Sequence, residues 1–131
     1  FYDFVVTSGG LKVSDTEAPP QEALEAAMML GLSMERSRSQ PVTQEMIYSH
    51  SLVIAMEWSH VKLLGQQFNL GCSVVNVLAG YDHNQKLAGF DKFNIRDPYG
   101  KTVEDFVYCY ERISRCIDNL FKQTGYPLRS S

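Results

Sequence analysis

Apolar and polar positions follow two patterns along this chain, and each predicts a different kind of element. Two short runs, residues 51–56 and 72–78, are apolar on both faces and rich in Val, Ile and Leu. Such runs are typical of parallel strands that are covered on both sides. The same pattern predicts a further strand over residues 1–7, where aromatic and β-branched side chains predominate.

The second pattern is helical and is clearest near the C-terminal end. Thr102 and Asp105 stand in the positions of a capping box, which predicts that a helix begins there. Apolar residues then recur every three or four positions for about five turns, as expected for one buried helical face. These residues are Val103, Phe106, Val107, Tyr110, Ile113, Ile117, Leu120 and Phe121.

Shorter helices are predicted between the strands. One covers residues 21–30 and ends at Gly31, another is capped by Thr43, and a third covers residues 57–68. Strands that alternate with helices predict an α/β fold, with three α/β/α layers and a small, mostly parallel sheet. We expect one domain over residues 1–127, followed by a tail.

Composition excludes several classes of protein. The 131 residues carry a formal net charge of −3, with a pI near 5.5. Because this charge offers no basic footprint, we expect no nucleic acid and no anionic membrane as a partner. No apolar run approaches the roughly 20 residues that span a bilayer.

Cysteine and histidine positions predict no metal and no cofactor. Cys72, Cys109 and Cys116 lack the spacing of metal ligands, and they suit reduced thiols in a cytoplasmic protein. The three histidines also lack ligand spacing; they are His50, His60 and His83.

The candidate chemistry lies just before the long helix, in the sequence Asp97-Pro98-Tyr99-Gly100. Proline fixes its own φ and favours extended geometry at the preceding Asp97, so the carboxylate is held away from a helix. Such a carboxylate is a candidate general acid. An ordinary turn that leads into a helix is the alternative interpretation of these residues.

Several motifs in this order resemble the low-molecular-weight protein tyrosine phosphatases. Residues 8–10, Ser-Gly-Gly, look like the Ser-Ala-Gly of that family, and residues 38–43 look like its Arg-[Ala/Ser]-[Arg/Gln]-x-[Leu/Val]-Thr. Residues 53–56 with His60 are similar to its Leu-Ile-x-x-Met and following histidine, and residues 97–99 to its Asp-Pro-Tyr loop. The resemblance implies a sheet of strand order 2-1-3-4.

One motif of that family is not found where the resemblance requires it. The Cys-x5-Arg-Ser phosphate loop and the central first strand would precede Phe1. The match from Cys109 to Arg115 lies inside a predicted helix without glycine, so we interpret it as chance. We therefore expect that a preceding segment, or another chain, supplies a strand between residues 1–7 and 51–56.

The resemblance implies hydrolysis of a phosphotyrosine protein or a small aryl phosphate through a phosphocysteine intermediate. Asp97 would be the general acid and then the general base, and Tyr99 would form one wall of the substrate slot. Ser8 would support the phosphate loop, as would Ser37, which stands where the family usually has histidine. The 131 residues alone should be inactive.

Two other functions stay open. The first is a catalytically inactive relative that binds phosphorylated or other protein partners. The second is an arsenate reductase on the same fold, which needs a redox cysteine pair soon after the strand that ends at Met56. Residues 57–68 contain no cysteine, which places this function last.

Overall fold

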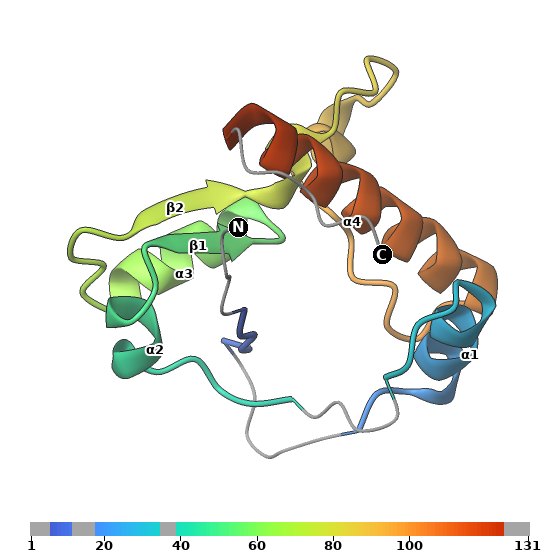
Figure 1. Ribbon diagram of the computed structural model, residues 1–131, viewed down its shortest axis with the longest axis horizontal. Helices are drawn as coiled ribbons and strands as arrows, with labels where there is room; N and C mark the ends of the chain where they lie inside the picture. The colour runs from blue at the N-terminus through green and yellow to red at the C-terminus, as the bar shows by residue number, and fades with distance from the viewer. Residues whose placement is uncertain (1–5, 12–17, 35–38, 125–131) are drawn as a thin grey trace.

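The computed structural model describes residues 6–11, 18–34 and 39–124. Figure 1 shows the helices and strands in chain order, with two short 3-10 helices labelled η in the text. The elements are α1 (Gln21–Met29), α2 (Gln44–Tyr48), β1 (Leu52–Ala55), α3 (Trp58–Gln67), β2 (Val74–Val77), η1 (Leu78–Tyr81), η2 (Gly89–Lys92) and α4 (Val103–Thr124).

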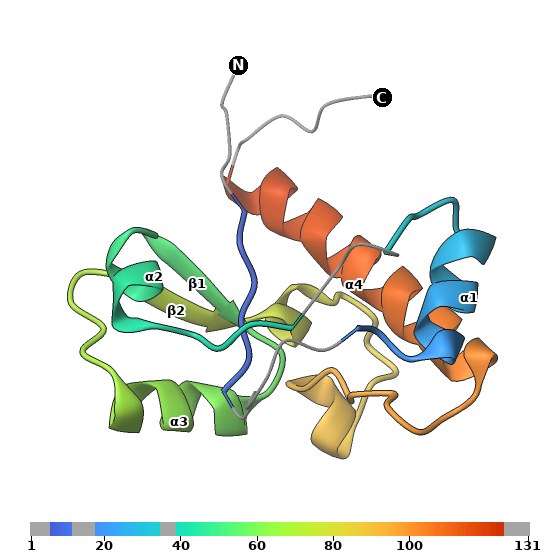
Figure 2. The ribbon, with the colours of Figure 1, turned by 90° about the horizontal axis from the view of Figure 1, so that it is seen from below.

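In the part of the chain that the structure describes, the sheet consists of two parallel strands. β1 and β2 pair in a register that places Leu52 opposite Val74 and Ala55 opposite Val77. Helix α3 joins the two strands and contacts both of them, and Figure 2 shows it beneath the sheet, with α4 beyond the carboxyl ends of the strands. Ile54 of β1 packs against a core that includes residues of α4. The chain is thus an α/β fold with a small parallel sheet, as its sequence predicts.

Two clusters of buried residues in the described part of the chain involve α4. One cluster joins the end of β2 and η1 to the middle of α4; it contains Leu78, Ala79, Ile95, Cys109 and Cys116. The other joins α1 to the beginning of α4 through Ala23, Ala26 and Phe106. The small alanine side chains allow α1 to approach the Phe106 ring closely. Helix α4 therefore connects α1 to the region around η1.

The helix ends confirm the predicted caps. Gly31 has a φ of 75°, and its N–H donates to the carbonyl of Met28 while that of Leu32 donates to Ala27, at 2.8 Å. This is the Schellman arrangement, in which a left-handed glycine satisfies the last carbonyls of a helix. Thr43 accepts a hydrogen bond from the N–H of Met46 and caps α2.

The capping box of α4 is also present. The hydroxyl of Thr102 accepts from the N–H of Asp105 at 3.2 Å, and the Asp105 carboxylate accepts from the N–H of Thr102 at 3.2 Å. The Thr102 hydroxyl also donates to this carboxylate. Two backbone donors at the helix start are thus satisfied by side chains.

The strands differ from their predicted extent. β1 and β2 are each four residues long, because the buried Leu78 and Ala79 turn into η1 instead of continuing β2. Val6 and Thr7 are not in a strand, and the rest of the predicted strand over residues 1–7 lies outside the described residues. Val6 is 84% exposed, so no layer covers it in the described part of the chain.

Candidate functional site

The Asp97 carboxylate is held by the backbone that follows it. Its Oδ1 accepts a hydrogen bond from the N–H of Tyr99 at 3.0 Å, and the N–H of Lys101 donates to the carbonyl of Pro98. Gly100 has a φ of 78°, the left-handed geometry that the third position of a type II turn requires. Two successive turns therefore fix Asp97 in an exposed loop, with one carboxylate oxygen engaged in its own turn.

The loop begins at a buried anchor beside the sheet. Ile95 is 4% exposed, and its N–H donates to the carbonyl of Met56 at 2.8 Å. Met56 directly follows β1, so Asp97 lies just beyond the carboxyl end of a parallel strand. In open α/β sheets this is the edge at which ligands bind.

The structure brings together only part of the predicted site. Tyr99 shares the loop of Asp97 and is 73% exposed, so its ring is available to a ligand. Ser8 is exposed, and its carbonyl accepts a hydrogen bond from the Gln40 side chain at 2.8 Å. Among the described residues, no hydrogen bond joins Ser8 to Asp97 or Tyr99. Ser37 lies outside the described residues.

The Cys-x5-Arg match of α4 forms no phosphate loop, as the sequence predicts. Both of its ends lie inside one continuous helix, and Cys109 is buried. Burial and the Asp97 carboxylate raise the pKa of the Cys109 thiol, against a smaller opposing effect of Arg112. Burial, followed by the Asp82 carboxylate, raises the pKa of Cys116 to about 11. Neither thiol is therefore a thiolate nucleophile at neutral pH.

A buried ion cluster lies beside the site, and sequence reasoning missed it. The Asp82 carboxylate, 0% exposed, accepts from Arg112 Nε at 2.8 Å and from Arg115 Nη2 at 3.0 Å. Burial alone would raise the pKa of Asp82, but hydrogen bonds from both arginines and from the N–H of Asn84 lower it to about 2. One residue in the sequence could have indicated this cluster. Arg112 places a cation between Cys109 and Cys116 on the same face of the predicted helix.

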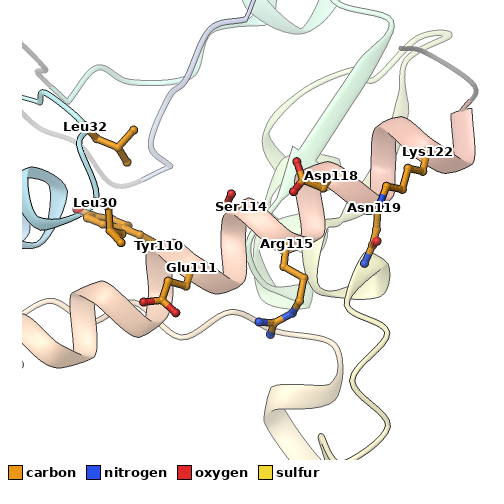
Figure 3. Close-up of a pocket in the computed structure, with 9 residues that line it drawn as sticks. All are labelled: Leu30, Leu32, Tyr110, Glu111, Ser114, Arg115, Asp118, Asn119 and Lys122. Atoms are coloured by element: carbon orange, nitrogen blue, oxygen red, sulfur yellow. The ribbon is translucent and has the colours of Figure 1, made fainter. Parts of the chain in front are cut away.

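A surface groove of about 470 Å³ runs along α4, next to the C-terminal end of α1 (Figure 3). It is not lined by Asp97, Tyr99 or Ser8, so it is separate from the candidate site. Its lining residues are Leu30, Leu32, Tyr110, Glu111, Ser114, Arg115, Asp118, Asn119 and Lys122.

Metal-binding clusters and membrane-spanning helices are both absent from the described part of the chain. No group of three His, Cys, Asp or Glu side chains there is arranged to hold a metal ion. Among the same residues, no helix has both the length and the apolar content needed to cross a membrane.

Comparison with protein families identifies the chain. Residues 2–127 match the family described as low molecular weight phosphotyrosine protein phosphatase. The chain belongs to this family. The residues matched to this phosphatase family include all four to which the motifs pointed, Ser8, Ser37, Asp97 and Tyr99.

Solved structures share the phosphatase fold. The low molecular weight protein tyrosine phosphatase from T. tengcongensis is 24% identical, with a TM-score of 0.75; the match covers 89% of this chain and 76% of that one. A YwlE mutant from Bacillus subtilis is 23% identical, with a TM-score of 0.73 and coverage of 89% and 74%. Wzb from Vibrio vulnificus in complex with benzylphosphonate is 22% identical, with a TM-score of 0.66 and coverage of 82% and 68%. No curated protein matches the chain significantly.

Proposed function

We propose that these residues are the acid-bearing and substrate-binding part of a protein tyrosine phosphatase. The observation that carries this proposal is the position of Asp97. Its carboxylate is fixed by two turns, exposed to substrate, and placed beyond the carboxyl end of β1 in a chain of the phosphatase family. A buried or unanchored Asp97 would not have suited this role.

The proposed reaction has two steps. A cysteine thiolate attacks the phosphorus of phosphotyrosine, the bond to the phenolic oxygen breaks, and Asp97 donates its proton to the leaving phenolate. The Asp97 carboxylate then takes a proton from water as the water oxygen attacks the phosphorus of the phosphocysteine. The S–P bond breaks, which releases inorganic phosphate and returns the cysteine thiolate. Tyr99, whose ring is exposed two residues away, contacts the aromatic ring of the substrate.

In this proposal the nucleophile comes from a segment that precedes Phe1 and carries Cys-x5-Arg-Ser. Support comes from β1, because in the described part of the chain it pairs with β2 along one edge and with no strand along the other. Parallel strands normally lie inside a sheet with helices on both faces. The same segment would supply the missing neighbour of β1 together with the phosphate loop, which Ser8 and Ser37 would support.

Two structural relatives suggest substrates. Vibrio vulnificus Wzb was solved with benzylphosphonate, in which a methylene group joins the phosphonate to a phenyl ring, and this supports aryl phosphates as substrates for this chain. YwlE is an arginine phosphatase, and its cysteine-to-serine mutant was solved with a phosphorylated active-site serine. That phosphoserine supports a covalent phosphoenzyme in this fold. Phosphoarginine therefore belongs in the substrate panel, with phosphotyrosine as the expected preference.

The decisive experiment substitutes Asp97 in the full-length protein that contains these residues. We expect Asp97→Asn to lower kcat/KM for phosphotyrosine by about 100-fold, because a general acid contributes on the order of 10²–10⁴. Asp118→Asn, an exposed carboxylate on α4, is the matched control and should leave the rate unchanged. An unchanged rate for Asp97→Asn would remove Asp97 from the acid role.

The alternative is an inactive relative that binds phosphorylated partners. It is distinguished by the segment upstream of Phe1 and by turnover. A full-length protein that lacks Cys-x5-Arg-Ser, binds a phosphotyrosine peptide and releases no phosphate would replace the phosphatase proposal with this one.

A further inference from the structure

The stretch between η2 and α4 carries Asp97 but has no regular secondary structure after Lys92. Helices and strands fix their own backbone through repeated hydrogen bonds, whereas such a stretch depends on contacts from elsewhere in the fold. The position of the Asp97 carboxylate therefore depends on whatever holds residues 91–96.

One side chain provides two of these contacts. The Arg112 guanidinium donates through Nη1 to the carbonyl of Asn94 at 2.8 Å and through Nη2 to the carbonyl of Asp91. Its third nitrogen, Nε, donates to the Asp82 carboxylate at 2.8 Å. The planar guanidinium presents its donors in a fixed geometry, so it clamps two carbonyls at once in a way that lysine cannot.

Further contacts hold the backbone of the residues that directly precede Asp97. One turn before Arg112 on α4, the Cys109 thiol lies 3.8 Å from the carbonyl of Arg96. Ile95 is bound to the carbonyl of Met56. The N–H of Phe93 also donates to the carbonyl of Phe90, so the backbone is held at five of the six residues before Asp97, and Arg112 holds two of them.

The Arg112 guanidinium is itself held in place by the Asp82 carboxylate. Arg112 is 3% exposed, and the fully buried Asp82 carboxylate that it binds also accepts from Arg115 and from the N–H of Asn84. Arg115 differs from Arg112 in one respect that matters. It binds Asp82 but no carbonyl of residues 91–96, and its side chain is 44% exposed.

From these contacts we propose that Arg112 is the positioning residue for Asp97. Arg112 touches neither substrate nor phosphate; it sets where the carboxylate stands relative to the leaving oxygen. This inference rests on the proposed phosphatase function, because it requires Asp97 to act as the acid. A misplacement of about 1 Å can lower a rate by about 100-fold.

The test uses the full-length protein and two aryl phosphates, phenyl phosphate and p-nitrophenyl phosphate. Nitrophenolate leaves without much help from an acid, whereas phenolate needs its proton. We expect Arg112→Lys to lower kcat/KM for phenyl phosphate by about 10–100-fold, and for p-nitrophenyl phosphate by less than about threefold. Arg115→Gln, the matched control, should show no dependence on the leaving group.

A double-mutant cycle separates positioning from a general structural effect. In the Asp97→Asn background, Arg112→Lys should cause no further loss with phenyl phosphate, since the group that it positions is gone. Losses that multiply, or a loss that is equal for both substrates, would overturn the proposal. Asp82→Asn, which loosens the guanidinium without removing it, should give a smaller effect in the same direction and provides the readout if Arg112→Lys does not fold.

The outcomes also distinguish this inference from the proposed function. If Asp97→Asn itself shows no dependence on the leaving group, the acid assignment fails. If Asp97→Asn shows the dependence and neither Arg112→Lys nor Asp82→Asn does, the acid assignment stands and the positioning role of Arg112 is wrong.

Discussion

Among single residues, Asp82 concentrates the strongest electrostatic interactions of the described chain. Its carboxylate is removed from water yet stays charged, because two guanidinium groups and one backbone N–H donate to it. Loss of one partner from such a buried pair typically costs about 3–5 kcal/mol, since the other charge is left uncompensated. Asp82 is therefore a site where protonation should alter stability.

The pKa of Asp82 predicts how stability depends on pH. It is about 2 in the folded chain against an ordinary 3.8, so the ionised form stabilises the fold above about pH 4. This contribution, about 2 kcal/mol by linkage, should be lost as the pH falls from 5 toward 2. Urea unfolding at several pH values measures it in the full-length protein.

Asp82→Asn is the informative variant in that experiment. It should be less stable than the parent at pH 7, and the difference in the free energy of unfolding should shrink by about 2 kcal/mol by pH 2. The exposed Asp118→Asn should follow the parent curve. Parallel curves for the parent and Asp82→Asn would show that Asp82 does not titrate with a lowered pKa.

Two features at the level of single residues differ in how well the sequence predicts them. Asp97 and its turn were predictable, because Asp-Pro-Tyr-Gly determines its conformation within four residues. The partnership of Asp82 with Arg112 was not, because these residues are 30 positions apart and meet only when the connection after η1 packs against α4. Helical periodicity alone treats Arg112 as an interruption of the apolar face.

At the scale of elements, α4 owes its start to the capping box of Thr102 and Asp105. We expect Thr102→Ala to lower the free energy of unfolding by about 1 kcal/mol, because it leaves the N–H of Asp105 without its side-chain acceptor. Ser114→Ala, at an exposed position of the same helix, is the control and should change stability little. Equal effects of the two substitutions would contradict the cap.

Helices were predicted more accurately than strands, and the reason is physical. Caps and amphipathic spacing are local, so α1, α2 and α4 begin and end close to their predicted limits. The end of β2 is not local, because Leu78 and Ala79 are as apolar as the strand before them. They leave the strand because they pack against α4. A run of apolar residues in the sequence does not show which element those residues will pack against.

For the whole molecule, the most consequential feature is the edge of β1 that has no strand partner among the described residues. A two-stranded parallel sheet is a small unit, and isolated strand pairs are marginally stable. If the proposed preceding segment supplies both a strand and the phosphate loop, sheet completion and activity must arise together. This coupling follows from the architecture and not from any single side chain.

The last prediction compares residues 1–131 alone with the full-length protein. The shorter chain should release no phosphate from phosphotyrosine, and the amides of Leu52–Ala55 should exchange with deuterium faster than in the longer protein, because an unpaired strand edge opens readily. The amides of residues 110–118 in α4 serve as the internal control, because their hydrogen bonds lie within the helix in both forms. Turnover by residues 1–131 alone would contradict the proposal that the nucleophile lies in a preceding segment, and equal protection of β1 in the two proteins would contradict the proposal that this segment supplies a strand. Slow exchange of the β1 amides in a longer protein that remains inactive would support the added strand and contradict the proposed phosphatase activity.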